Sequence, residues 1–250
     1  METDIHLNHL LKNYKQWVMA FNYSPKILTD SLVFAVDAAN KKSYPGSGTS
    51  FNNLADSSNN FTINGSPTLN TLPDRFTFSS NQTTQYLEKS SYSFPANDYS
   101  ISIWVKFTTT SFNGATVSYA YSTSQNNESL MYFANGELRF YGPTDNVSTN
   151  WNIPNTTSWF NLVRTRIKSS GAEKLYVNGS QEFSGTLNAN VSTETPGTLI
   201  FGQEQDTVGG GFQSNQCFYG DFASMKLYNK NLSSTEITQN YNALKGRFGL

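Results

Sequence analysis

The sequence is short of the residues that most often carry catalysis, cross-links and charge-driven binding. Its 250 residues include one cysteine, Cys217, so no internal disulfide can form, and we expect Cys217 to pack as a small apolar residue. Both histidines, His6 and His9, stand near the start, so the rest of the chain cannot assemble a Ser-His-Asp, Cys-His or zinc-ligand arrangement. Charged residues make up 14% and the net charge is −1, which disfavours nucleic-acid binding, since that requires a basic face.

Long apolar segments are also missing. No run approaches the roughly 20 apolar residues of a membrane-spanning helix, so we expect no membrane insertion. The first residues lack the basic start, apolar core and small-residue cleavage site of a signal peptide. We therefore expect the protein to be made in a cytoplasm and to reach an extracellular setting by another route, such as release within a virion.

The chain is rich in aromatic and turn-forming residues. Aromatics make up 14%, and strands favour them, whereas the abundant Asn and Ser favour turns. From residue 28 onward, short strand-like runs alternate with turn signals, beginning with a buried run from Leu32 to Val36. Alternation is cleanest between Tyr99 and Phe107, where one face carries Ile101, Ile103, Val105 and Phe107. This pattern predicts an all-β fold, an antiparallel sandwich or barrel.

Asn-Gly pairs mark the predicted turns, because Asn-Gly supplies the two positive φ angles of a type I′ hairpin. They begin at Asn64, Asn113, Asn135 and Asn178. The clearest hairpins are predicted over Met131 to Gly142 and over Glu173 to Phe183, each with an Asn-Gly pair at its centre. We see no internal repeat and no linker after residue 30, which indicates one domain over residues 28–250.

A helix is predicted at each end of the chain. Residues 1–23 form an amphipathic stripe, closed by Pro25, from Leu7, Leu10, Leu11, Tyr14, Trp17, Val18 and Phe21. Residues 1–27 therefore form an N-terminal helix and linker, which either packs on the following domain or docks onto a partner or a second copy. Near the end, Ser233 to Glu236 form a capping box, Ile237, Tyr241 and Leu244 continue the helix, and Gly246 ends it.

The polar stretch from Phe201 to Asp221 is the main candidate site. It places Glu204, Gln205 and Asp206 in consecutive positions before a run of three glycines. Ca²⁺ takes six to eight oxygen ligands from carboxylates, amides and main-chain carbonyls, and glycine lets nearby ligands converge. The alternative is a solvated polar hairpin loop without a metal.

Two terminal stretches resemble a known family. Ser31 to Gly48 (SLVFAVDAANKKSYPGSG) and Leu232 to Gly249 (LSSTEITQNYNALKGRFG) resemble the ends of LamG-like domains in the concanavalin A-like lectin/glucanase superfamily, notably those of bacteriophage structural proteins. The GQEQD motif that starts at Gly202 and the glycine, Phe, Gln and Gly-Asp positions after it are similar to the calcium loop of pentraxins. The resemblance implies a jelly-roll sandwich over roughly residues 30–250.

The pentraxin resemblance also implies a ligand set. A first calcium ion would be held by Glu204, Asp206, the main-chain carbonyl of Gln205, and the pair Asn126 and Asn127, which lies in a stretch similar to a pentraxin strand pair. A second ion would share Glu204 and Asp206 and add Gln213 and Gln216. Asn126 and Gln213 stand where pentraxins have acids, so two carboxylates remain. We therefore expect one ion, bound with an affinity of about 10⁻⁴–10⁻³ M.

The resulting hypothesis is a non-enzymatic virion surface, fibre or adhesion protein that binds glycans or phosphorylated ligands with the help of calcium. Residues 1–27 would join it to other virion proteins or to copies of itself. Exposed aromatics can stack on sugars, and the candidates are Tyr119, Tyr121, Tyr132 and Tyr141; any of them can instead be packing residues. One alternative is a capsid or tail component without a ligand.

Another alternative is a glycoside hydrolase. Glu204-Gln205-Asp206 begins the Glu-x-Asp pattern of glucanases in the superfamily, but Thr207, Val208 and Gly209 occupy the positions where a second glutamate would stand. We therefore predict that the chain is not an enzyme.

Overall fold

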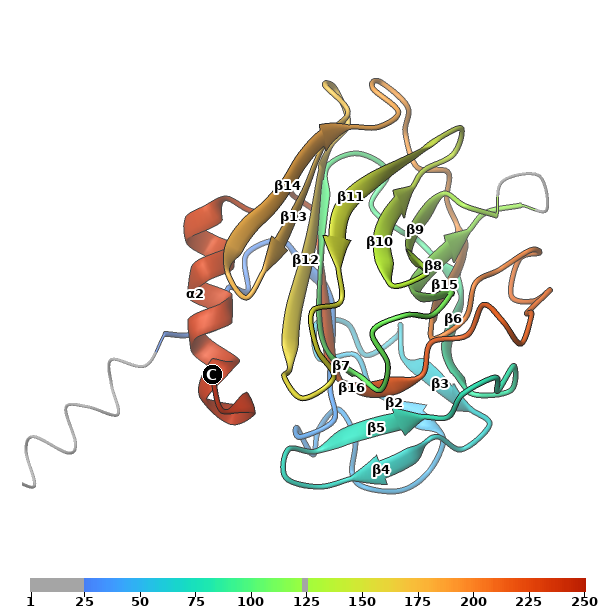
Figure 1. The fold of residues 1–250 in the computed structure, drawn as a ribbon, viewed down its shortest axis with the longest axis vertical. Helices are drawn as coiled ribbons and strands as arrows, with labels where there is room; N and C mark the ends of the chain where they lie inside the picture. Colours follow the sequence, from blue (N-terminus) through green and yellow to red (C-terminus); the bar gives the residue numbers. More distant parts are fainter. Residues whose placement is uncertain (1–24, 123–125) are drawn as a thin grey trace, which may run out of the picture.

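A computed structural model describes residues 25–122 and 126–250 of the chain (Figure 1). The N-terminal helix predicted over residues 1–23 lies outside the described residues. The strands are β1 (Leu32–Asp37), β2 (Ser50–Phe51), β3 (Phe61–Asn64), β4 (Thr68–Asn70), β5 (Arg75–Phe78), β6 (Tyr86–Tyr92), β7 (Tyr99–Phe107), β8 (Gly114–Ala120), β9 (Ser129–Ala134), β10 (Glu137–Tyr141), β11 (Asn146–Asn152), β12 (Phe160–Ile167), β13 (Ala172–Val177), β14 (Ser180–Thr186), β15 (Gly197–Phe201) and β16 (Gly220–Tyr228). The helix α2 (Ser234–Leu244) and the 3₁₀ helix η1 (Lys245–Phe248) follow.

Two eight-stranded antiparallel sheets pack face to face (Figure 1). The first sheet runs in the order β14-β13-β12-β7-β16-β5-β4, and β1 also pairs with β16. The second runs β11-β10-β9-β8-β15-β6-β3-β2. This architecture confirms the predicted antiparallel sandwich. None of the helices within residues 25–250, away from the gap at 123–125, is long and apolar enough to cross a membrane.

The core lies between the two sheets and is built from the inward-facing side of each strand. On β7, the side chains of Ile101, Ile103, Val105 and Phe107 are at most 1% exposed and belong to this core, as the alternation predicts. Many phenylalanines fill the rest of the space with edge-to-face contacts, such as Phe34 with Phe61 at 4.7 Å between ring centroids. A core of this size holds the sheets, and therefore the loops at their ends, in fixed positions.

Two of the four Asn-Gly pairs form the predicted turns. Between β9 and β10, Asn135 and Gly136 have φ angles of 53° and 88°, and between β13 and β14, Asn178 and Gly179 have φ angles of 52° and 84°. The prediction is wrong for the pairs that begin at Asn64 and Asn113, where only the glycine has a positive φ. At these two places the chain passes from one sheet to the other, from β3 to β4 and from β7 to β8, so neither pair closes a hairpin.

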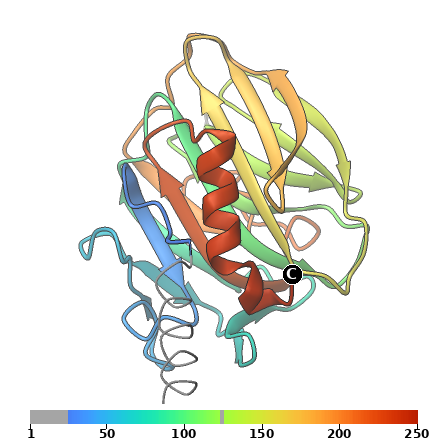
Figure 2. The same ribbon diagram turned by 90° about the vertical axis from the view of Figure 1, so that its left-hand side faces the viewer.

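The outer face of the first sheet is covered by α2 and η1 (Figure 2). The predicted capping box is present: the Ser233 hydroxyl accepts from the Glu236 amide, and the Glu236 carboxylate accepts from the Ser233 amide. α2 ends at Leu244, within two residues of the predicted end at Gly246, but the chain then continues as the 3₁₀ helix η1, which is closed by Gly249 with a φ of 73°. Phe248 accounts for this extension, since its ring stacks on Trp104 of β7 at 4.1 Å.

A buried ion cluster joins the sheets behind β9 and β10. Arg164 on β12 is fully buried and pairs with Glu173 on β13 at 2.9 Å, and Arg166 pairs with the same carboxylate at 3.1 Å. The Arg164 guanidinium also donates to the main-chain carbonyls of Leu130 and Tyr141 in the opposite sheet, at 3.2 and 3.1 Å. These bonds fix the positions of β9 and of the end of β10, which form one wall of the site described next.

Candidate metal site

The loop from Gly202 to Tyr219 connects the two sheets of the sandwich. It leaves β15 in the second sheet and enters β16 in the first. The loop therefore does not close a hairpin, although the metal-free alternative described it as a hairpin loop. Main-chain bonds hold its start and end together: the Gly202 amide donates to Thr116 at 3.0 Å, and the Phe218 amide donates to Gly202 at 2.9 Å. Cys217 is 1% exposed there, which confirms its expected packing.

Residues 203–206 alternate between anchoring side chains and site-forming side chains. Gln203 and Gln205 are fully buried, and their amide nitrogens donate to main-chain carbonyls, of Gln82 and Gln85 for Gln203 and of Ser118 and Thr198 for Gln205. The side-chain oxygen Oε1 of Gln205 accepts from the Gly209 amide at 2.8 Å, which sets the turn of the loop. Because successive side chains of an extended segment point to opposite sides, Glu204 and Asp206 are both delivered to the cavity.

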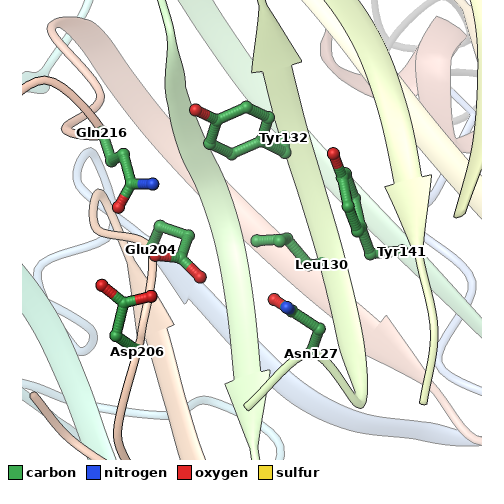
Figure 3. Close-up of a pocket in the computed structure, with 7 residues that line it drawn as sticks. All are labelled: Asn127, Leu130, Tyr132, Tyr141, Glu204, Asp206 and Gln216. Atoms are coloured by element: carbon green, nitrogen blue, oxygen red, sulfur yellow. The ribbon is translucent and has the colours of Figure 1, made fainter. Parts of the chain in front are cut away.

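That cavity, of about 260 Å³, lies against the outer face of the second sheet (Figure 3). It is lined by Asn127, Leu130, Tyr132, Tyr141, Glu204, Asp206 and Gln216. Asn127 comes from the loop between β8 and β9, and its neighbour Glu128 fixes that loop by accepting from the Glu194 amide at 2.7 Å. The site therefore gathers side chains from two loops and two strands. Asn127 and Glu204, which come from the two loops, are 77 residues apart in the sequence.

Three acceptor oxygens in this cavity have no hydrogen-bond partner among the described residues. They are Oδ1 of Asn127, Oε2 of Glu204 and Oε1 of Gln216, and all three are buried. A buried acceptor without a partner costs on the order of 1–3 kcal/mol, so three of them in one cavity indicate a missing cationic or donor group. Two of the oxygens are amide carbonyls and the third is a carboxylate, which is the ligand chemistry of calcium.

The protein environment disfavours the charge of the Glu204 carboxylate. Burial raises the pKa of Glu204 to about 7, and the neighbouring charge of Asp206 adds to the shift. Glu204 is 5% exposed, so little water compensates its negative charge. A bound cation reverses this balance, because it stabilises the ionised form of both groups.

The other predicted ligands lie around Asp206 and do not line the cavity. The Asn126 amide nitrogen donates to the Asp206 main-chain carbonyl at 3.1 Å, and the exposed Gln213 donates to the Asp206 carboxylate at 2.6 Å. The Gln205 side chain is an anchor, and ligation through the Gln205 main-chain carbonyl stays a prediction. Of the seven predicted residues, the structure thus brings Asn127, Glu204, Asp206 and Gln216 into one cavity and leaves Asn126, Gln205 and Gln213 as its supports.

Among the predicted aromatics, Tyr132 and Tyr141 line the cavity, with ring centroids 6.0 Å apart and planes at 79°. Tyr119 is fully buried in the core and donates to the carbonyls of Tyr92 and Glu194, so its selection as a stacking residue is wrong. Tyr121 is 40% exposed but does not line this cavity. Leu130 was missed, although its two-residue spacing from Tyr132 on β9 places both on one face.

The carboxylates and amide oxygens present fit a calcium ion. In residues 25–122 and 126–250 there is no group of three or more His, Cys, Asp and Glu side chains that could hold a metal. The donor set of this cavity is instead two carboxylates supplemented by neutral oxygens, which hard cations such as calcium accept and zinc does not favour.

Comparison with known proteins identifies the family. Residues 74–246 match the family model described as the Pentaxin family, which is more than half of the chain. The chain belongs to the pentraxin family. Neuronal pentraxin-1 of Homo sapiens is 29% identical over 140 residues, covering 56% of this chain and 32% of that protein. Serum amyloid P-component of Mus musculus is 31% identical over 121 residues, covering 48% of this chain and 54% of that protein. This pentraxin chain therefore spans between a third and about half of these relatives.

Solved structures show the same fold. The native heptameric SAP-like pentraxin from Limulus polyphemus superposes with a TM-score of 0.56 at 20% identity, covering 65% of this chain and 78% of that one. The receptor-binding domain of botulinum neurotoxin C/D mosaic serotype superposes with a TM-score of 0.60 at 17% identity, covering 86% of this chain and 51% of that one. The two superpositions thus show that the pentraxin chain has the jelly-roll sandwich fold of these proteins.

Proposed function

We propose that this pentraxin domain is a non-enzymatic binding module that uses one calcium ion to bind glycans or phosphorylated ligands. The observation that carries the proposal is the convergence of three unpartnered buried oxygens, from Asn127, Glu204 and Gln216, beside the Asp206 carboxylate. Calcium would supply a site that a sugar hydroxyl or a phosphate oxygen can ligate directly.

The charge of the site favours one ion. Glu204 and Asp206 together carry two negative charges when ionised, which balance a single Ca²⁺. A second ion would leave two positive charges in a partly buried cavity, with no further acid lining it. Because the site has only two charged ligands, we expect weak calcium binding, with a dissociation constant of about 10⁻⁴–10⁻³ M.

The surface that could contact a ligand extends beyond the proposed calcium ion. A second hollow of about 210 Å³ adjoins the site and shares Asn127 and Tyr141 with it; its other walls are Asn126 and residues 142–146. Tyrosine rings provide flat apolar faces for sugar rings, and the surrounding amides and hydroxyls supply hydrogen bonds. This combination supports a ligand larger than one sugar or head group.

The proposal also covers where the protein is located. We place the module on an extracellular surface, that of a phage particle, because its terminal stretches resemble LamG-like domains of phage structural proteins. Residues 1–27 would attach it to other virion proteins or to copies of itself. A deletion of residues 1–23 tests this role: it should leave a folded domain and abolish assembly in light scattering, and an unchanged assembly would contradict it.

Thermal unfolding with and without calcium tests the metal proposal. Millimolar calcium should raise the melting temperature of the wild type, and the double variant Glu204→Gln with Asp206→Asn should lose that rise. Magnesium serves as the control ion, because it demands a smaller octahedral site. If calcium at several millimolar leaves the melting temperature unchanged, the proposal fails, and a structural protein without a ligand becomes the better interpretation.

A glycan array in calcium and in chelator then tests binding. Calcium-dependent retention on particular glycans supports the lectin-like role. Turnover of a retained oligosaccharide, detected as new reducing ends, would instead establish the glycoside hydrolase alternative.

A further inference from the structure

Another cavity, separate from the two hollows described above, lies on the opposite side of the sandwich from the metal site, between β1 and the end of α2. It measures about 270 Å³, and six apolar residues contribute to its walls: Ile27, Leu32, Ala35, Val36, Leu54 and Leu244. The remaining lining residues are Thr29, Asp37, Asn40 and Lys226. Figure 2 shows β1 and α2 on this face, and Figure 1 shows the loop after β15 on the other side of the sandwich.

Lys226 is the unusual member of this lining. It stands on β16 opposite Ala35 of β1 and is 7% exposed, yet within residues 25–122 and 126–250 its amine makes no hydrogen bond or ion pair. The nearby charges are committed to each other, since Arg247 donates to the Asp37 carboxylate at 2.6 Å. Buried lysines are normally paired, because an isolated buried ammonium is costly.

Burial has the expected electrostatic consequence. It lowers the pKa of Lys226 to about 8, while the charge of Asp37 opposes the shift and that of Arg247 adds to it. The amine is nevertheless mostly protonated at pH 7. The cavity therefore offers mainly apolar walls and one amine without a direct hydrogen-bond or ion-pair partner, which is the combination of a small-molecule site with a single orienting group.

We propose that this cavity binds a small carboxylic acid with a compact apolar body, whose carboxylate pairs with Lys226. The volume suits such a ligand: a cavity of about 150 Å³ accepts benzene, and about 270 Å³ leaves room for a ring or short chain that bears a carboxylate. The carboxylate supplies the charge partner that Lys226 lacks, and the body of the ligand removes the apolar walls from water.

Benzoate is the probe for the full-length chain. Calorimetric titration at pH 7 should detect benzoate binding, and benzyl alcohol, which has the same ring without the charge, should bind at least tenfold more weakly. Lys226→Met replaces the amine with an apolar side chain of similar length, and it should weaken benzoate at least tenfold while leaving benzyl alcohol within about twofold. Lys230→Met, at a lysine that is already paired with Asp30 and Glu236, should change neither.

Three results would overturn the proposal. They are the absence of benzoate binding to the wild type, equal binding of benzoate and benzyl alcohol, and unchanged benzoate affinity in Lys226→Met. Should Lys226→Met fail to fold, Lys226→Gln provides the same neutralisation with a polar side chain, and it should give the same loss. Adding calcium should leave benzoate affinity unchanged, because the two sites lie on different sheets.

Discussion

Replacing Glu204 with glutamine should stabilise the metal-free protein at pH 8 and destabilise the calcium-loaded one. In the folded state burial and Asp206 raise the pKa of Glu204 from 4.5 to about 7. Between these pH values the folded state retains a proton that the unfolded state has released, so the free energy of unfolding falls as pH rises. The penalty is absent below pH 4.5 and complete above pH 7, and glutamine, which has no charge, never incurs it.

The size of the effect follows from the two pKa values. Their separation corresponds to about 3 kcal/mol, since one pKa unit is worth about 1.4 kcal/mol. We therefore expect the metal-free variant to gain about 2–3 kcal/mol at pH 8 and nothing at pH 4.5. In saturating calcium the sign reverses, because the ion loses a carboxylate ligand.

Urea denaturation in chelator at several pH values between 4.5 and 8 measures this difference, and a parallel series in millimolar calcium measures the reversal. Glu182→Gln is the matched control, since Glu182 is an exposed residue of β14 away from the cavity, and it should show neither trend. A Glu204→Gln protein that is less stable than wild type at pH 8 in chelator would refute the electrostatic reasoning. It would mean that the carboxylate already has a compensating partner.

Three further predictions concern side chains away from the carboxylates. Gln205→Leu should weaken calcium binding at least tenfold in calorimetry, because it removes the anchor of the loop, whereas Gln213→Ala, at an exposed position, should weaken it less. Lys226→Met should raise the free energy of unfolding by about 2 kcal/mol in urea at pH 7, and the gain should vanish between pH 8 and 10.5, where the folded wild type has already lost the lysine proton. Glu173→Gln should lower the free energy of unfolding by about 3–5 kcal/mol, because it leaves the buried guanidinium of Arg164 without its partner; equal stability of variant and wild type would contradict this.

The fold could be predicted from the sequence because its signals are local. Alternation on β7, the Asn-Gly turns at Asn135 and Asn178, and the capping box at Ser233 each need only a few neighbouring residues, and the structure confirms them. The 3₁₀ helix η1 that follows α2 could not be predicted this way. Gly246 is a reasonable stop by its conformational freedom, but the stacking of Phe248 on Trp104, a contact across 144 residues, extends the chain into η1.

The buried charged side chains are a second feature that local sequence signals could not predict. Arg164 and Arg166 share a face of β12 with the core residues Phe160 and Leu162, but their charge would by itself place both side chains in solvent. The structure instead buries them in the sandwich, where Glu173 from the adjacent strand and carbonyls from the opposite sheet satisfy them. Only the pairing of β12 with β13 brings the compensating charge close, and sequence periodicity does not contain that pairing.

Some residues of the site could be predicted from their local sequence, whereas others could be predicted only from the family resemblance. The GQEQD motif alone suggests oxygen ligands at Glu204 and Asp206, and the two-residue alternation then explains why the intervening glutamines are buried anchors. Asn127 could be named only through the pentraxin resemblance, since nothing in the residues of its own loop indicates a partner in the loop after β15.

The positions that depart from pentraxin acids show how a short sequence change alters the site. An acid at position 213 would repel Asp206 unless a cation lay between them, whereas Gln213 donates its amide hydrogen to the Asp206 carboxylate without any ion. Asn126 likewise donates to the Asp206 main chain, which an aspartate could not do. Each amide thus replaces a ligand that needs a metal with a donor that holds Asp206 in place without one. Under the proposed calcium-binding function, the arrangement favours a preformed site for a single ion over a pair of ions, because the loop would already hold its geometry without calcium.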